Sequence, residues 1–457
     1  MTSSKKNIRI LSADWVLPIS SEPIQKGAVA IENDKIIEVG KAQTLKEKFP
    51  NAEYEEFGEA VITAGFVNCH SHLELSVMRG FLDDVEDEFF KWLLKIAVTR
   101  DQKLTNEDIE ISALLGAVEG LRAGVTCFGD IGRYGKAGFE ALKKTGLRSV
   151  VFQETEFSPF NEKADEDFAK LKDKFLDLKA TETKLVKVGI SPHAPYTVSQ
   201  KLFELITDYA LAENVKISIH AAESKIEEDL MTHGTGAMAD FYQARGIDWT
   251  PPKLSSIKYL AEIGVLEAKP LLAHCIRTDE IDWKLIRESG SSIAHCPKSN
   301  AKFGHSVAPL EKFLDNNLRI GLGSDSVASN NTCDLLEEAR FATLTARARE
   351  DKTRLIFAKE LIEMMTLGGA KALQLENEIG SLEAGKQADL VVISLKNIAQ
   401  QPVHDIYSTL LFASNARDVY LTMVGGEEIY REGKTMKFDE NELKGKVREI
   451  AKKMYDE

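Results

Sequence analysis

The sequence predicts an α/β fold, namely a (β/α)8 TIM barrel joined to a small β-rich domain built by both ends of the chain. In the middle of the chain, short apolar runs rich in β-branched residues alternate with longer segments of helical period. Both ends instead consist of short strand-like segments separated by Gly, Asn and Asp turns. At 457 residues the chain exceeds one typical domain, which favours one large and one small unit.

The barrel is expected over residues 62–377. The apolar runs begin near Ile62, Val125, Ser149, Val186, Ile217, Leu271, Ser292 and Ile320. Residues 106–122 show one intervening helix, with Thr105 as its N-cap, Asp108 three residues later and Gly124 just past its end. Eight such units over roughly 250–300 residues are typical of a (β/α)8 barrel, whose catalytic residues lie at the C-terminal ends of its strands.

The two ends of the chain are expected to pair with each other. Residues 27–31 and 35–39 have the pattern of strands around an Asn33-Asp34 turn. The tail from Ile379 likewise consists of strand-like segments separated by turn residues. We therefore predict one composite domain from residues 1–61 and 378–435, followed by a C-terminal helix over residues 436–457.

Composition and charge exclude several classes of function. The chain carries 72 acidic and 58 basic side chains, which gives a formal net charge of −14. A nucleic-acid or anionic-membrane partner is therefore not expected. No apolar stretch approaches the roughly eighteen residues of a membrane span, and the first residues lack the apolar segment of a secretory signal. These features favour a cytoplasmic enzyme with a small-molecule substrate.

The cysteines fit neither a disulfide framework nor a thiolate zinc site, because they are odd in number and form no C-x-x-C pair. They are Cys69, Cys127, Cys275, Cys296 and Cys333. Three of them adjoin a histidine, and neighbours in a strand point to opposite faces. We interpret them as buried apolar fillers, with a catalytic thiol as the alternative.

Most of the histidines fall at or just beyond the end of a predicted strand. They are His70, His193, His220, His274 and His295, and Asp325 follows the eighth strand in the same way. Strand ends of a barrel meet at one mouth, so these side chains are expected to converge there. The alternative is a set of separate hydrogen-bonded core histidines.

The strongest indication of a metal site is the segment Asn68-Cys69-His70-Ser71-His72. Residues i and i+2 of a strand share a face, so both imidazoles can reach one ion. With His220 and Asp325 they supply three neutral nitrogens and one carboxylate, which suits one divalent ion. We predict Zn²⁺, with Fe²⁺ as the alternative, and an open position for a water molecule that the metal acidifies.

Glu223 lies three residues after His220 and is expected to shuttle a proton between the water and the substrate. The alternative is a solvated loop glutamate, because other acidic residues follow closely. His193 lies between prolines that fix its loop, and His274 and His295 are suited to polarising the water or a developing charge. The remaining histidines lack strand-end positions and are expected to be structural; they are His233, His305 and His404.

Other catalytic motifs do not occur. The chain contains no G-x-S-x-G elbow, no P-loop and no H-E-x-x-H. His72-Leu73-Glu74 matches half of the cytidine-deaminase signature, but the P-C-x-x-C half is missing.

The motifs that remain occur in a characteristic order. They are GFVNCHSHLELS, SPHAPYT, IHAAE, LAHC, HCPKSN, GLGSDS and IGSLEAGKQADLVV. Together they resemble the amidohydrolase superfamily over nearly the whole chain. The nearest branch holds the S-adenosylhomocysteine/methylthioadenosine deaminases, guanine deaminases, aminofutalosine deaminases and triazine chlorohydrolases. The resemblance implies a distorted barrel, a small β-sandwich from both termini, a mononuclear metal site and a homodimer.

The resemblance also implies roles for the converging residues. The metal ligands would be His70, His72, His220 and Asp325. Glu223 would protonate a ring nitrogen, while His274 and Asp325 would orient and deprotonate the attacking water. His193 and His295 would contact the substrate.

For the substrate, the resemblance favours aminodeoxyfutalosine. HLELS differs from the small residue and proline that usually follow the histidines of S-adenosylhomocysteine-type enzymes, and it is similar to the aminofutalosine deaminases. Glu74, Trp92 and Arg148 are candidate substrate contacts. The alternatives are a turn-capping role for Glu74, a core position for Trp92 and a surface ion pair for Arg148.

The leading functional hypothesis is therefore hydrolytic deamination of an aminopurine-type ring in a modified nucleoside. After aminodeoxyfutalosine, the candidate substrates are S-adenosylhomocysteine, methylthioadenosine and adenosine, which are not ranked among themselves. One alternative is an s-triazine chlorohydrolase or another cyclic amidine or amide hydrolase. The alternative from another class is an inactive, metal-free binding homologue.

Overall fold

The central strands of the computed structural model, which describes residues 8–455, form two parallel four-stranded sheets. The first holds β6 (Phe66–Ser71), β7 (Val125–Gly132), β8 (Arg148–Glu154) and β9 (Val186–Ser191). The second holds β10 (Ser218–Ala221), β11 (Leu271–His274), β12 (Ser292–His295) and β13 (Arg319–Leu322). Parallel bridges Ile190↔Ile217 and Ser71↔Asp325 join the two sheets at both junctions. The strands thus follow one another in a ring, which confirms the predicted barrel.

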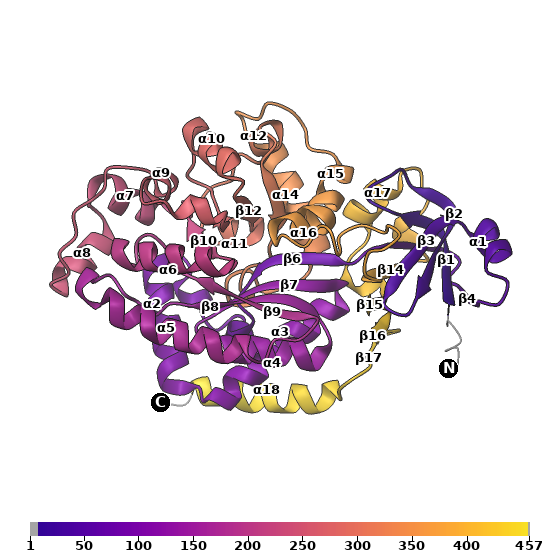
Figure 1. Ribbon diagram of the computed structural model, residues 1–457, viewed down its shortest axis with the longest axis horizontal. Coiled ribbons are helices and arrows are strands. Elements are labelled where there is room, and N and C mark those ends of the chain that lie inside the picture. The colour runs from indigo at the N-terminus through magenta and orange to yellow at the C-terminus, as the bar shows by residue number, and fades with distance from the viewer. Residues whose placement is uncertain (1–7, 456–457) are drawn as a thin grey trace.

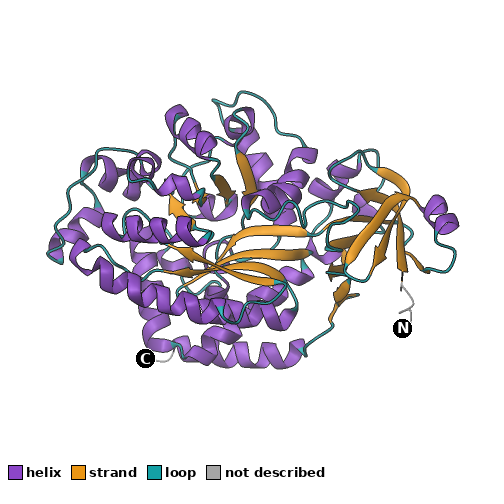
Figure 2. Ribbon diagram, in the orientation of Figure 1, coloured by secondary structure: helices purple, strands orange, loops and turns teal. Residues whose placement is uncertain are grey.

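Helices cover the outside of this ring (Figures 1 and 2). The larger ones are α3 (Asn106–Arg122), α4 (Gly135–Thr145), α5 (Ala164–Lys179), α6 (Gln200–Glu213), α10 (Glu280–Ser289) and α14 (Leu335–Ala348). The helix predicted over residues 106–122 is confirmed, because the Asp108 amide donates to Thr105 Oγ1 and the Asp108 carboxylate accepts the Thr105 amide in a capping box.

Further helices stand over the barrel mouth or between the units. They are α2 (Phe89–Lys103), α7 (Lys225–His233), α8 (Ala237–Ala244), α9 (Ser256–Glu262), α11 (Pro297–Lys302), α12 (Leu310–Asp315), α13 (Val327–Asn330), α15 (Ala358–Glu363) and α16 (Gly369–Ala372). The end domain adds α1 (Ala42–Lys48) and α17 (Ile406–Ser408).

The first barrel strand begins later than predicted. Ile62 belongs to β5 (Ala60–Ala64), which pairs with strands of the end domain, and the barrel begins with β6. Gly65 separates the two strands, and a Cβ at this position would lie 2.1 Å from Thr126 Oγ1. The apolar run from Ile62 therefore contains two strands separated by a close approach of the backbone to its neighbour.

Strands from both ends of the chain lie in one nine-stranded sheet, at the right of Figure 1. From the N-terminal side come β1 (Ile8–Leu17), β2 (Ile24–Glu32), β3 (Lys35–Lys41), β4 (Glu53–Glu56) and β5. From the C-terminal side come β14 (Leu390–Ser394), β15 (Val419–Val424), β16 (Glu427–Arg431) and β17 (Lys434–Thr435). The two groups meet where β5 pairs antiparallel with β14.

The C-terminal segment forms α18 (Glu440–Tyr455), which returns to the barrel. Lys453 Nζ lies 3.0 Å from the Asp108 carboxylate, so α18 is held against the start of α3. The expected helix over residues 436–457 is thus shorter at its start, and its last two residues lie outside the described chain.

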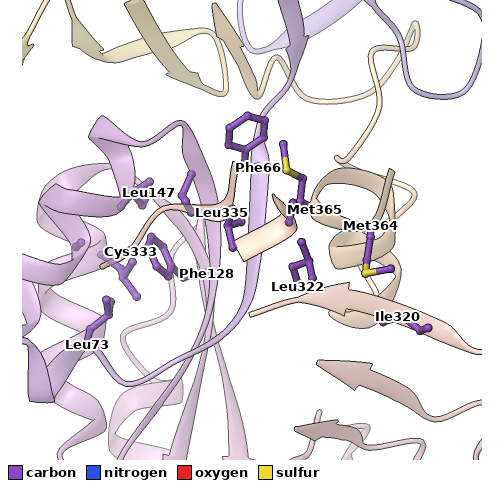
Figure 3. Packing of buried hydrophobic residues seen from close by; sticks show 14 of the residues in the cluster. Phe66, Leu73, Phe128, Leu147, Ile320, Leu322, Cys333, Leu335, Met364 and Met365 are labelled. Atoms are coloured by element: carbon purple, nitrogen blue, oxygen red, sulfur yellow. The ribbon is translucent and has the colours of Figure 1, made fainter. Parts of the chain in front are cut away.

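Barrel and end sheet share one large apolar core. Figure 3 shows Phe66, Phe128 and Met365 packed where the first barrel strands meet the helices behind them. All five cysteines are free and buried, as predicted for apolar fillers. None of the helices between residues 8 and 455 combines the length and the apolar composition of a membrane span.

Candidate metal centre and active site

Three histidines converge at the carboxyl ends of the barrel strands. His70 lies within β6 and is fully buried, and His72 stands directly before the 3-10 helix η1 (Leu73–Met78). His220, in β10, places its Nε2 3.1 Å from His72 Nε2. One nitrogen of each imidazole lies within 4.8 Å of the other two.

Asp325 joins this group from the loop after β13. Its Oδ1 lies 3.5 Å from His70 Nε2 and 3.6 Å from His72 Nε2. Its Oδ2 accepts hydrogen bonds from Ser299 (2.5 Å) and Ser329 (3.1 Å), which fix the carboxylate. Burial would raise the pKa of Asp325, but the close approach and charge of His70 and the neighbouring histidines hold it well below its usual range.

This donor set fits a divalent metal ion. Both ring nitrogens of His70 are buried with no hydrogen-bond partner among the described residues, an arrangement that is rare unless something else satisfies them. Burial lowers the pKa of His70 to about 4 and that of His220 well below its usual value, so both imidazoles are neutral and present lone pairs. Nδ1 of His220 donates to the His193 carbonyl (3.1 Å), which leaves Nε2 as the ligand atom.

Glu223 lies beside this centre, on the loop between β10 and α7. Its backbone N–H and that of Ala222 donate to the Glu227 carboxylate at 2.8 and 2.7 Å, so a second carboxylate holds the loop. Glu223 is only 5% exposed, which contradicts the solvated-loop alternative. Burial, with the negative charges of Asp325 and Glu227, raises its pKa well above the usual value, which favours the protonated form of Glu223.

His274, the last residue of β11, faces the same carboxyl group. Its Nε2 lies 3.5 Å from Glu223 Oε1. Its Nδ1–H donates to Asn300 Oδ1 at 2.9 Å, which leaves Nε2 as a proton acceptor. The site therefore pairs a protonated acid with an imidazole base.

A cavity of about 400 Å³ opens above these groups. The polar residues that line it include His72, His193, His220, Glu223, His274 and Asp325. Apolar side chains of α2 and α8 line it as well, among them Phe90, Trp92, Met238 and Phe241. A ligand would thus place a polar reacting part near the cluster and an apolar part against the two helices.

Two of the five predicted substrate contacts line the cavity. His193 accepts or donates one hydrogen bond through Nδ1 with Thr197 Oγ1 (2.8 Å), and burial lowers its pKa to about 3. Trp92, on α2, packs against Phe303 with ring centroids 4.7 Å apart. These two positions agree with a role in substrate binding.

Arg148 is placed elsewhere. It begins β8, at the end opposite the mouth, where its Nε pairs with Asp389 Oδ2 (2.8 Å) just before β14. The predicted substrate contact is therefore corrected to a buried ion pair between barrel and end sheet. A partner 241 residues away could not be recognised from local sequence.

Glu74 and His295 lie outside the cavity lining. Glu74 is buried in η1, accepts from Arg100 Nη1 (2.8 Å) and from the Tyr134 amide (2.8 Å), and so holds Arg100 in the cavity wall. His295 is buried at the end of β12, and burial lowers its pKa to about 3. Both predicted contacts are corrected to positions behind the wall.

The structure adds residues that the sequence analysis did not single out. Glu154 ends β8, lines the cavity and has an unpartnered Oε1, and it lies within 4.8 Å of donor atoms of His193 and His220. Its position at the end of a strand could have placed it at the barrel mouth from sequence alone. His305, which was expected to be structural, lies 4.0 Å from Glu223 and follows no strand, so no local pattern marks it.

Fold and site together define a (β/α)8 barrel whose mouth holds a cluster of histidines and an aspartate that fits a divalent metal ion. The family model described as the amidohydrolase family matches residues 61–429, and a bacterial imidazolonepropionase-like composite domain model matches residues 27–52. The chain belongs to the amidohydrolase family, which confirms the resemblance. It is a hydrolase that acts on carbon–nitrogen bonds other than peptide bonds.

Individual proteins show the same relationship. A 5-methylthioadenosine/S-adenosylhomocysteine deaminase of Thermodesulfovibrio yellowstonii is 30% identical over 442 residues, covering 95% of this chain and 96% of that protein. A zinc-bound adenosine deaminase from Xanthomonas campestris superposes with a TM-score of 0.85 at 24% identity, covering 98% of each chain. The aminofutalosine deaminase of Helicobacter pylori, in complex with methylthio-coformycin, has a TM-score of 0.76 at 23% identity, covering 92% of this chain and all of that one.

Proposed function

We propose that this protein is a zinc-dependent deaminase that releases ammonia from the adenine-type ring of a modified nucleoside, with aminodeoxyfutalosine as the favoured substrate. The observation that carries the proposal is the buried Glu223, which lines the same cavity as the metal-ligand cluster, lies 3.5 Å from the base His274 and has a pKa raised toward the protonated form. Displacement of an amine needs a proton donor at the ring, and a solvated carboxylate would not supply one at neutral pH.

A divalent ion held by His70, His72, His220 and Asp325 would acidify a water molecule toward a pKa of about 7 and polarise the substrate beside it. Nε2 of His274 accepts the proton that the attacking water loses. Glu223 donates its proton to the ring nitrogen next to the amine-bearing carbon, so that the ring can accept the oxygen. The amine takes up the proton held by His274 and leaves as ammonia. The proton of the added hydroxyl returns to Glu223, and the ring retains the oxygen as a carbonyl.

The cavity supports a nucleoside that carries a large apolar and anionic substituent. Phe90, Trp92 and Phe241 offer aromatic surface, and Arg245 stacks on Phe241 with its guanidinium carbon 4.3 Å from the ring centroid. Arg245 also lines the cavity and is exposed, so its charge is available to a ligand. Aminodeoxyfutalosine carries an aromatic carboxylate that would meet both features, whereas methylthioadenosine has no anionic group.

The direct test is ammonia release by zinc-loaded protein on a substrate panel. The panel contains aminodeoxyfutalosine, S-adenosylhomocysteine, methylthioadenosine, adenosine and an aminotriazine. We expect the highest kcat/KM for aminodeoxyfutalosine. Preference for S-adenosylhomocysteine or methylthioadenosine would refute aminodeoxyfutalosine as the favoured substrate but would agree with a deaminase. Zinc-bound protein that releases no ammonia from any substrate of the panel would refute the proposed function.

A further inference from the structure

One buried histidine near the reacting groups has no part in the mechanism above. His305 follows α11, and its backbone N–H donates to the Asn300 carbonyl at 2.9 Å. Its side chain is 7% exposed. Its Nε2 lies 4.0 Å from Glu223 Oε1, the same oxygen that faces His274 at 3.5 Å. Two imidazoles thus face one oxygen of the proton donor, one from the end of β11 and one from the loop after α11.

The surroundings of His305 fix its ring. Phe89 of α2 meets it edge to face at 4.5 Å, and Phe303 stacks on it at 5.3 Å. Its Nε2 is buried and has no hydrogen-bond partner among the described residues. A buried donor left without a partner costs about 1–3 kcal/mol, so this nitrogen would be stabilised by an acceptor within hydrogen-bond distance.

We propose that His305 is a positioning residue for Glu223, and this inference rests on the proposed function. Its Nε2–H donates to Glu223 Oε1 in the substrate complex, where the present distance of 4.0 Å shortens as catalytic hydrogen bonds commonly do. Oε2 is then the oxygen that carries the proton, and its orientation toward the ring is fixed. After the proton is transferred, the same hydrogen bond stabilises the carboxylate that remains.

The arrangement also links the acid to the cavity wall. Phe89 touches His305 and lies on α2, the helix that carries Trp92. A ligand that contacts α2 therefore lies against the helix that packs on His305, whereas a purely structural His305 would only fill the space between Phe89 and Phe303.

The test compares two substitutions in zinc-loaded protein. His305→Leu keeps the apolar contacts and removes the donor, and we expect kcat to fall about tenfold with KM within about twofold of wild type. His305→Gln places an amide donor near the position of Nε2 and should restore kcat to within about threefold. His404→Leu, at an exposed position, is the matched control and should leave kcat and KM unchanged.

A double-mutant cycle separates positioning from packing. In a Glu223→Gln background, His305→Leu should cost less than about twofold, because its effect passes through Glu223. An equal cost in both backgrounds, a Gln variant as slow as the Leu variant, or a Leu variant as fast as wild type would each overturn the proposal. If the Leu variant unfolds, His305→Met replaces it. A wild-type protein that releases no ammonia refutes the proposed function itself. An active wild type together with an equally active His305→Leu variant refutes only the role of His305.

Discussion

Replacement of Glu223 by Gln tests the proton donor directly. Gln has nearly the same volume and shape, so the loop held by Glu227 and the cavity should keep their geometry. The amide cannot transfer a proton to the ring nitrogen. Because Glu223 is not among the clustered metal-ligand groups, metal content should remain that of the wild type.

The expected magnitude follows from the environment of the carboxyl group. Glu223 is almost completely buried and its raised pKa favours the protonated form, which is the form that can act as a general acid. Such groups contribute roughly 10²–10⁴-fold. At 1.36 kcal/mol for each factor of ten, this is a barrier increase of about 3–5 kcal/mol. KM should change little, since the lost interaction is made in the transition state.

The assay is initial-rate ammonia release, with zinc measured in the same samples. Glu156→Gln is the matched control, because Glu156 also lines the cavity but is exposed and pairs with Arg133 and Lys174. The control should stay within about threefold of wild type. A Glu223→Gln enzyme with full zinc and a kcat within threefold of wild type would refute the proton-donor role.

Three further outcomes are expected. Asp325→Ala should bind clearly less than one equivalent of zinc after dialysis, because the only carboxylate of the ligand group is lost; full metal and full activity would contradict its role as a ligand. In a pH–rate profile, kcat should fall as the pH rises through the raised pKa of Glu223, since the protonated form is the active one, and this alkaline limb should be absent in Glu223→Gln. Arg148→Met should lower the free energy of unfolding in denaturant titrations by about 3–5 kcal/mol, because Asp389 stays buried without its partner, while kcat of the folded protein stays within about twofold; a loss of activity without a loss of stability would reinstate Arg148 as a substrate contact.

Local pattern was sufficient for the barrel and for the metal-ligand group. Alternation of apolar runs with helical segments marks each strand, and a residue at a strand end reaches the barrel mouth whatever its neighbours are. The sequence pattern alone therefore places the predicted metal ligands together at the barrel mouth; they are His70, His72, His220 and Asp325. The helix over residues 106–122 was equally readable, because its capping box involves residues three positions apart.

The tertiary structure decided which polar groups face each other across the chain. From sequence, Arg148 and Glu74 were predicted to contact the substrate. In the structure Arg148 pairs with the carboxylate of Asp389, and Glu74 pairs with the guanidinium of Arg100. His305 looked structural until the fold brought it beside Glu223. The physical reason is that periodicity and capping act over a few residues, whereas the partner of a buried charge is set by the packing of segments that are distant in sequence.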